Sequence, residues 1–268
     1  MSRGTITLLS DFGTTDPYVS AMKGVALSVN PAVQLVDMSH EINPHDVAEA
    51  GFVLAMAHGY YPAGTVHVAV VDPGVGSERR ILAAEVAGQV LMAPDNGLLT
   101  MALSRTPPRR IVHVANADYF RHPVSMTFHG RDIFAPVAAH LTLGVDLGEM
   151  GAEVEDYKRL EAAAAAVSAE AIDGQVIHVD RFGNLVTNIT REDLATFQSG
   201  ARGGLRVHVA AAEIAGVSRT YAEAGLGELL AVIGSTGLLE LSTNQGSAAD
   251  VLGVGRRTRV RVTQSARA

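Results

Sequence analysis

Short apolar segments alternate with longer amphipathic ones in the first half of the chain. The apolar, β-branched runs at residues 6–10, 33–39 and 65–72 are separated by the stretches 18–30 and 47–61, which have the length and pattern of helices. Strands that are almost continuously apolar, and that alternate with helices of this length, are typical of a parallel sheet covered on both faces. We therefore predict an N-terminal α/β domain.

Three further apolar runs extend the predicted sheet. They cover residues 81–87, 89–95 and 110–116, and the segment 134–144 predicts a closing helix. We place the N-terminal α/β domain, with its parallel sheet and helices on both faces, at residues 1–157.

The stretch from Lys158 to Ala171 contains a run of alanines and no turn residues. Alanine is the strongest helix former, so this composition predicts a connecting or packed helix at a domain boundary. We assign residues 158–171 to a linker.

The pattern changes in the second half, where apolar runs follow one another with Gly, Asn and Ser turns between them and no helical stretch. Such a sequence predicts a smaller, mostly β C-terminal domain, which we place at residues 172–268. The predicted strands lie at residues 174–180, 184–189, 205–210, 228–234, 238–243 and 257–263.

The composition agrees with two globular domains and narrows the possible partners. The chain has 268 residues, of which 47% are hydrophobic and 18% charged, enough to form two cores. Its formal net charge of -7 provides no positive field for a nucleic acid, so a small-molecule partner is favoured. The absence of cysteine excludes disulfides, thiolate nucleophiles and zinc–thiolate sites.

No segment of the sequence is typical of secretion or membrane insertion. The apolar run near the N-terminus is too short for a signal peptide, and no run is long enough to span a membrane. We therefore expect a cytoplasmic protein without a membrane partner.

Two carboxylates stand at predicted strand ends, where open α/β sheets bind ligands. Asp11 suits the two hydroxyls of a ribose, although a turn or helix cap is an alternative role. Asp72 is followed by a Pro- and Gly-rich turn, and either Arg79 or Arg80 is close enough in sequence to pair with it. The spacing fits neither the dinucleotide fingerprint nor the P-loop, and a surface ion pair is the alternative.

Histidines give a second group of candidates. His129 directly precedes Gly130. A histidine side chain can position or accept a proton near neutral pH. His40, Glu41 and His45 invite a metal site, but Pro44 prevents the helical spacing that such a site needs, and we predict no metal.

Polar residues also gather at turns of the second domain. Asp180, Phe182 and Asn184 share one predicted β-turn and offer a carboxylate, an aromatic face and an amide, which suit an adenine ring and an amino acid. The alternative for this turn is a hairpin with a buried Phe182. Ser235 and Glu240 follow the apolar run at 228–234.

Seven segments, in this order along nearly the whole chain, resemble the S-adenosyl-L-methionine (SAM) hydroxide adenosyltransferase family, which is related to the bacterial fluorinase and chlorinase. The segments are SDFGTTDPYVSAMKG, HEINPHDVAEAGFVL, VVDPGVGSERR, APDNGLLT, TFHGRDIFAPVAAHL, DRFGNLVTNI and GSTGLLELSTNQGSAA. The resemblance implies a parallel α/β domain followed by a β domain. It also implies a homotrimer with active sites between subunits.

The resemblance also implies roles for individual residues. Asp72, Arg79 and His129 match the catalytic set that activates water in the hydrolases. His45 stands where relatives often carry Trp or Phe. The residues that match substrate contacts are Asp11 for the ribose, Asp16 and Asp180 near the methionine, Asn184, Phe182 and Tyr221 for the adenine, Ser235 for the methionine carboxylate, and Glu240 in the same segment.

Within the family, the positions of Asp72 and His129 favour hydrolysis. The resemblance implies tyrosines at both positions in the halogenases, whereas this chain keeps an acid and a base. The expected reaction is attack of water on the ribose 5′ carbon of SAM, giving adenosine and methionine without a cofactor. The sequence leaves open whether Asp72 or His129 takes the proton. The alternatives are a halogenase and a non-catalytic protein that binds adenosine or SAM.

Overall fold

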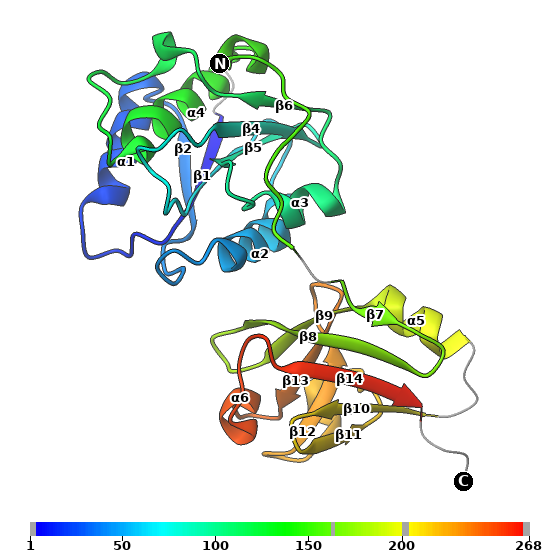
Figure 1. Cartoon of the computed structure of the whole chain (residues 1–268). Coiled ribbons are helices and arrows are strands. Elements are labelled where there is room, and N and C mark those ends of the chain that lie inside the picture. The colour runs from blue at the N-terminus through cyan, green and yellow to red at the C-terminus, as the bar shows by residue number, and fades with distance from the viewer. Residues whose placement is uncertain (1–3, 162–163, 200–203, 265–268) are drawn as a thin grey trace. The chain divides into compact units, whose positions relative to one another are not determined.

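The computed structural model describes residues 4–161, 164–199 and 204–264, which form two compact units (Figure 1). The first unit spans Met1–Ala162 and the second Ala163–Ala268. Within the described ranges, no helix is long and apolar enough to cross a membrane.

A six-stranded sheet forms the centre of the first unit, in the order β2-β1-β3-β5-β4-β6. β1 pairs in parallel with β2 and β3, and β3 with β5, whereas β4 runs antiparallel to both of its neighbours. The strands are β1 (Thr5–Ser10), β2 (Gln34–Ser39), β3 (Val66–Val70), β4 (Ile81–Val86), β5 (Gln89–Pro94) and β6 (Arg110–His113). The predicted fold class is confirmed, with a sheet that is mixed and mostly parallel.

A tight turn explains the reversed strand. Ala87 and Gly88 alone connect β4 to β5, and both have positive φ, 49° and 78°. Two-residue turns of this handedness join antiparallel strands, because their twist matches that of the strands. The two apolar runs on either side therefore form a hairpin.

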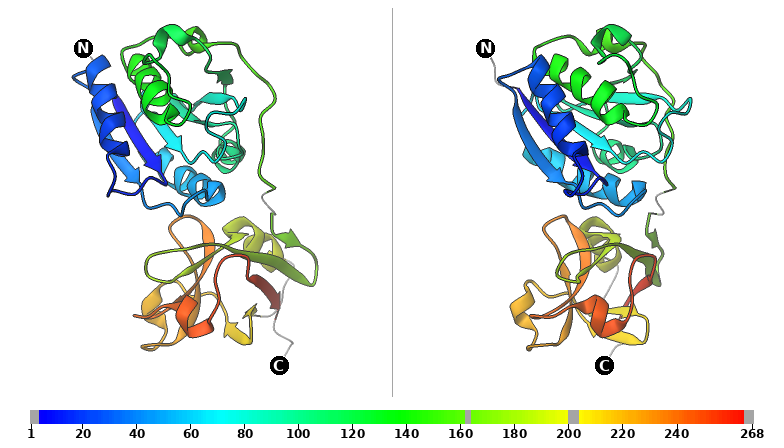
Figure 2. Two further views of the ribbon diagram at one scale, coloured as in Figure 1. Left: turned by 60° about the vertical axis from the view of Figure 1, so that its left-hand side comes forward. Right: turned by 90° about the vertical axis from the view of Figure 1, so that its left-hand side faces the viewer.

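Helices cover both faces of the sheet, as predicted. On one face lie α1 (Tyr18–Val29) and α4 (Ala135–Thr142), side by side in both views of Figure 2. α2 (Val47–Ala57) and α3 (Thr100–Arg105) cover the other face. A π-helical turn, η3 (Gly130–Phe134), leads directly into α4. Three 3-10 turns complete the helical elements of this unit up to residue 161: His58–Tyr60, Ala117–Tyr119 and Leu147–Met150. Another, Tyr221–Glu223, lies in the second unit.

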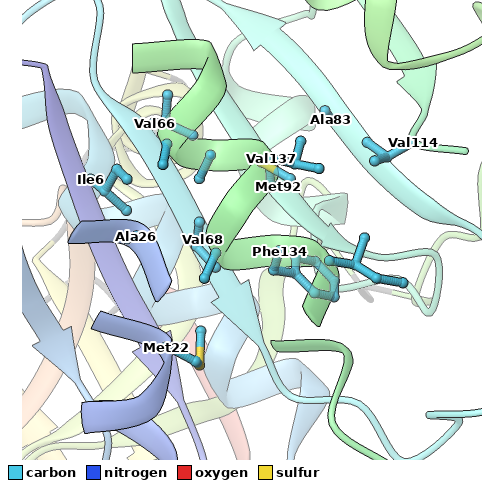
Figure 3. Packing of buried hydrophobic residues seen from close by; sticks show 14 of the residues in the cluster. Ile6, Met22, Ala26, Val66, Val68, Ala83, Met92, Val114, Phe134 and Val137 are labelled. Carbon is cyan, nitrogen blue, oxygen red and sulfur yellow. The ribbon is translucent and has the colours of Figure 1, made fainter. Parts of the chain in front are cut away.

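Alternating side chains on the strands supply two separate cores. Val66 and Val68 belong to the core under α1 and α4, which also contains Met22 of α1 and Phe134 at the end of η3 (Figure 3). Ala69, the residue after Val68, faces the opposite way and belongs to the core under α2 and α3. A strand buried on both faces must be apolar at nearly every position, which explains the continuous runs in the sequence.

The helix predicted across the linker is wrong. Residues 155–161 and 164–165 form no helix, and Ala166–Val167 form the short strand β7. The backbone N–H groups of Lys158 and Leu160 donate to Asp95 and Thr100, at 2.7 and 2.9 Å. Hydrogen bonds to the first unit thus replace those of a helix, and tertiary contacts override alanine propensity. Ala162 and Ala163 lie outside the described residues.

The second unit contains an antiparallel sheet in the order β11-β10-β14-β8-β9-β13-β12, with β7 paired to β8. The strands are β8 (Ala171–Val179), β9 (Leu185–Thr190), β10 (Leu205–Val209), β11 (Ala212–Ala215), β12 (Leu229–Ile233), β13 (Leu238–Thr243) and β14 (Arg259–Gln264). Ser218, which follows β11, bridges to Val232 of β12, so the sheet almost closes into a barrel.

The second unit is mostly β, as predicted, and its described residues also include two α-helices that were not predicted from the sequence. α5 (Arg191–Ser199) and α6 (Ala248–Leu252) follow β9 and β13. At the start of α5, Asp193 N donates to Thr190 Oγ1 at 3.0 Å and Thr190 N donates to Asp193 Oδ2 at 2.8 Å. This reciprocal cap is encoded by Thr and an acidic residue three positions later, a signal that the sequence carried.

Candidate active site

The carboxyl edge of the first sheet collects the polar candidates of that unit. Asp11 follows β1 and Asp72 follows β3, and these neighbouring strands are parallel, so both carboxylates emerge at one edge. Because β4 is antiparallel, it starts at this same edge, where Arg79 and Arg80 precede it. This is the expected position for a ligand site in an open α/β sheet.

Asp72 and Arg79 form an ion pair that is almost fully buried, with side chains 5% and 6% exposed. Arg79 Nε donates to Oδ1 and Oδ2 of Asp72 at 2.9 and 2.8 Å, and Nη2 donates to Oδ2. A planar guanidinium that meets a carboxylate with several donors fixes its orientation as well as its charge. The surface ion pair considered from the sequence is therefore excluded.

Arg79 also contacts His129, the residue before the π-helical turn η3. Its Nη2 lies 2.8 Å from Nδ1 of His129, whose side chain is buried. Burial, together with the positive charge of Arg79, lowers the pKa of His129, while Asp72 and Asp132 oppose that change. A π-helical turn is rare and often occurs beside functional residues.

A pocket of about 310 Å³ opens beside these groups, near the lower limit of small-molecule sites. Asp72 and His129 line it together with Asp11 and His45. The remaining wall includes three aromatic side chains. The rings of Phe12, Tyr18 and Phe128 contact one another with centroids 5.2–6.1 Å apart.

Asp11 and His45 are joined through the backbone. His45 N donates to Asp11 Oδ2 at 2.9 Å, and His45 has a φ of 67°, which is unusual for a residue other than glycine. Backbone strain of this kind concentrates at functional sites. The second carboxylate oxygen of Asp11 makes no hydrogen bond among the described residues.

Two other candidates of this unit lie outside the pocket. Asp16 is exposed in the turn before α1. Arg80 pairs with the buried Asp95 and with Asp156, not with Asp72. Next to Asp95, the side chain of Asn96 donates to Val71 O and accepts from Leu98 N, and so stabilises the end of β5 at the sheet edge.

On the second unit, the turn at Asp180 is closed by hydrogen bonds to its carboxylate. Oδ1 accepts from the backbone N–H groups of Phe182 and Asn184, and Oδ2 accepts from Asn184 Nδ2 at 2.8 Å. This arrangement leaves Phe182 77% exposed. The alternative of a hairpin with a buried Phe is therefore excluded.

Tyr221 and Glu240 form a second polar group near this turn. Tyr221 OH donates to Glu240 Oε2 at 3.2 Å. Burial raises the pKa of Glu240, and the charge of Asp180 acts in the same direction. Ser235 is exposed in the turn between β12 and β13. An exposed aromatic ring beside buried polar groups is a surface suited to a flat heterocycle.

One network on the first unit was not found from the sequence. Ser10 Oγ lies 2.7 Å from Nδ1 of His40, and His40 Nε2 lies 3.0 Å from Asp37, which also binds Lys23. Both ring nitrogens of His40 are therefore occupied, which removes it from the metal site considered above. Within residues 4–161, 164–199 and 204–264, no group of three His, Asp or Glu side chains is arranged to hold a metal ion.

Comparison with known proteins identifies the class to which this fold and site belong. Residues 6–151 match the SAM hydroxide adenosyltransferase N-terminal domain, and residues 174–261 match the C-terminal domain of the same family. The chain belongs to the SAM hydroxide adenosyltransferase family.

Similar proteins within the family carry two different activities in their names. The (R)-S-adenosyl-L-methionine hydrolase of Thermus thermophilus is 40% identical over 266 residues, which cover 96% of this chain and 98% of the relative. A fluorinase of an Actinoplanes species is 31% identical over 270 residues, 89% of this chain and 90% of the relative. A crystal structure of an uncharacterized protein from Thermotoga maritima, 35% identical, superposes with a TM-score of 0.90 over 97% of this chain and 100% of its own.

Proposed function

We propose that the chain hydrolyses S-adenosyl-L-methionine to adenosine and L-methionine, and that its substrate is the R epimer at sulfur. The observation that supports this most directly is the single guanidinium of Arg79, which binds both Asp72 and His129 at the wall of one pocket. Full-length relatives named (R)-S-adenosyl-L-methionine hydrolase support the same reaction.

In this proposal, the contact with Arg79 determines which ring nitrogen of His129 carries the proton. A guanidinium is always charged and has only donors, so Nδ1 of His129 must accept from it. The lowered pKa keeps the ring neutral near pH 7, and its one proton is then on Nε2. In this mechanism His129 donates a hydrogen bond to the attacking water and does not take its proton.

Asp72 is then the proton acceptor. A carboxylate has about four lone-pair positions, and Arg79 occupies three of those of Asp72, so that one is left for water. The water oxygen forms a bond to the ribose 5′ carbon as the bond from that carbon to sulfur breaks. The electron pair goes to sulfur, which leaves as the neutral thioether of methionine, and the water proton goes to Asp72.

The remaining candidates bind the substrate in this proposal. The free oxygen of Asp11 accepts from the ribose hydroxyls, His45 lies against the same pocket, and Asp16 serves the methionine end. Asp180, Phe182, Asn184, Tyr221, Ser235 and Glu240 bind adenine and methionine groups from the second unit. We propose a homotrimer in which these two sets come from different chains.

The products of purified protein with each SAM epimer provide the first test. We expect adenosine and methionine, formed faster from the R epimer than from the S epimer. Adding chloride or fluoride should give no halogenated deoxyadenosine. A halogenated product would favour the halogenase alternative, and tight binding without turnover would favour a binding protein.

Asp72→Asn tests the proton acceptor. We expect hydrolysis to fall by at least about a hundredfold while SAM binding is retained, because Asp72 contacts water and not the adenosyl group. Asp95→Asn is a matched control, since Asp95 also follows a strand of this sheet and pairs with an arginine outside the pocket. Near-normal kcat in Asp72→Asn would remove Asp72 from the mechanism.

Mixed oligomers test the shared site. Asp72→Asn and Asn184→Ala chains, each inactive alone, should regain partial activity when they are refolded together. The expected mass in solution is three times 28.1 kDa. A monomer with full activity at assay concentration would contradict the shared arrangement.

A further inference from the structure

The loop that carries His129 is held at its start by hydrogen bonds to one buried residue at its end, Asp132. The Asp132 side chain is 0% exposed. Its Oδ2 accepts from the backbone N–H of Ser125 at 2.9 Å, and its own backbone oxygen accepts from Arg121 N at 2.8 Å. Asp132 therefore holds the chain before His129 while it lies only three residues after it.

Two arginines complete the environment of this carboxylate. Arg131 Nε donates to Oδ1 at 2.7 Å and Nη2 to Oδ2 at 2.8 Å, while Arg121 Nη1 donates to Oδ1 at 3.1 Å. Burial alone would raise the pKa of Asp132, but hydrogen bonds from Arg131, Ser125 and Arg121 hold it below its ordinary value. The group is thus a charged, fully bonded fixed point in the interior.

Arg131 connects Asp132 to the pocket wall. The guanidinium carbon of Arg131 lies 5.0 Å from the centre of the Phe128 ring. Phe128 contacts Tyr18 and Phe12, and residues 127–130 all line the pocket. Neither Asp132 nor Arg131 lines it themselves.

We infer that Asp132 is a positioning residue for hydrolysis, which sets the place of His129 and, through Arg131, of the aromatic wall. The inference rests on the proposed function. A role as the cap of α4 does not explain the buried carboxylate, because Asp132 lies inside the π-helical turn and α4 begins only after that turn. A shift of the imidazole by about 1 Å would cost roughly a hundredfold in rate.

Asp132→Asn and Arg131→Lys separate charge from geometry. Asp132→Asn removes the charge and an acceptor, so kcat should fall by about tenfold to a hundredfold. Arg131→Lys keeps a cation but loses the fork and the stacking on Phe128, and should lower kcat similarly. Asp146→Asn, which breaks an exposed ion pair with Arg110 on the same unit, is the control and should keep the wild-type kcat.

The pH profile distinguishes positioning from mere stabilisation of the fold. The charged groups that act on His129 are Arg79, Asp72 and Asp132, and Asp132 raises its pKa; Asp11 and His45 line the same pocket. In Asp132→Asn the acid limb of kcat should therefore move to lower pH, whereas in Arg131→Lys it should stay. A role in stability alone would leave kcat per folded enzyme and the acid limb unchanged in both.

The inference can be judged apart from the reaction by nuclear magnetic resonance of the labelled His129 ring. The titration of this ring should shift to lower pH in Asp132→Asn, whether or not the wild-type protein hydrolyses SAM. A shifted titration without hydrolysis in the wild type would overturn the proposed function alone. Folded Asp132→Asn with wild-type kcat and ring titration would overturn the inference. If Asp132→Asn does not fold, wild-type kcat in Arg131→Lys would overturn it.

Discussion

Nη2 of Arg79 lies 2.8 Å from Nδ1 of His129, so the imidazole accepts a hydrogen bond from a permanent cation. The same nitrogen also donates to Asp72. Arg79 thereby determines the orientation of one group and the protonation of the other, and its replacement separates these two effects.

Arg79→Lys should lower kcat by about a hundredfold, because a single ammonium cannot reproduce the planar set of donors. Arg79→Met should also move the acid limb of kcat to higher pH. The positive charge of Arg79 contributes to the lowered pKa of His129, so its removal raises that pKa and the neutral ring is lost earlier as the pH falls. Steady-state rates across the pH range measure both effects.

Arg80→Lys is the control for these variants, since its partners Asp95 and Asp156 lie outside the pocket. It should keep the wild-type kcat and acid limb. Equal losses in the two lysine variants would show that Arg79 acts through the loop and not through His129.

Hydrolysis in ¹⁸O-labelled water should place the heavy oxygen on the 5′ carbon of adenosine. Chirally deuterated substrate should show inversion at that carbon, since one in-line displacement inverts the centre and a covalent intermediate inverts it twice. Mass spectrometry and the configuration of the product measure the outcome. Net retention would make Asp72 a nucleophile and contradict the proton transfer proposed above.

Gly234→Ala should weaken substrate binding through Glu240. A Cβ at residue 234 would lie 1.7 Å from Glu240 Oε1, so the carboxylate that binds Tyr221 must leave its position. We expect KM to rise by about tenfold, equivalent to the loss of roughly one hydrogen bond, with a smaller change in kcat. Gly255→Ala is the control on the same unit, because nothing lies within 4 Å of its added Cβ. An unchanged KM in Gly234→Ala would exclude Glu240 from the binding site.

The first unit should lose stability in acid because of His67, which is fully buried in β3. Burial, followed by the nearby His58, lowers the pKa of His67 to about 4 from its ordinary value of 6.5. Between pH 6.5 and about 4, the unfolded chain therefore binds a proton at His67 that the folded chain does not bind. The stability present above pH 6.5 is lost as the pH falls toward 4. The loss should reach about 3 kcal/mol.

Urea unfolding followed by circular dichroism at about pH 7 and about pH 4 measures this loss. His67→Gln, which keeps a polar group near Thr7 but does not titrate, should reduce the difference between the two pH values by about the same 3 kcal/mol. An identical pH dependence in the variant and the wild type would exclude His67 as the cause.

The sequence was sufficient for the strands of the first unit because burial on both faces leaves a continuous apolar pattern at β1 and β3. It was also sufficient for α1, α2 and α4, but the short helix α3 was missed. It was insufficient for the direction of β4, which depends on the backbone conformation of Ala87 and Gly88. It was misleading in the linker, where hydrogen bonds of Lys158 and Leu160 to the first unit outweigh helix propensity. The start of α5 was missed although its cap was present.

The candidate site was predictable where residues are close in sequence and less so where they are not. Asp72 and Arg79 lie in one loop, and the spacing already suggested a pair. The hydrogen bond from Arg79 to His129 joins residues 50 positions apart, and only the fold brings them together. The aromatic contacts of Phe12, Tyr18 and Phe128 have the same origin, since no local pattern marks them as neighbours.

The reversed direction of β4 makes the Asp72–Arg79 pair a local contact. A parallel β4 would have to start at the opposite edge of the sheet, and a long crossover would then separate the two residues. With β4 antiparallel, the chain leaves β3 and enters β4 at the same edge, and the partners are seven positions apart. The entropy lost in bringing them together is that of closing one short loop. The pair is therefore able to form early in folding, before the helices have docked on the sheet.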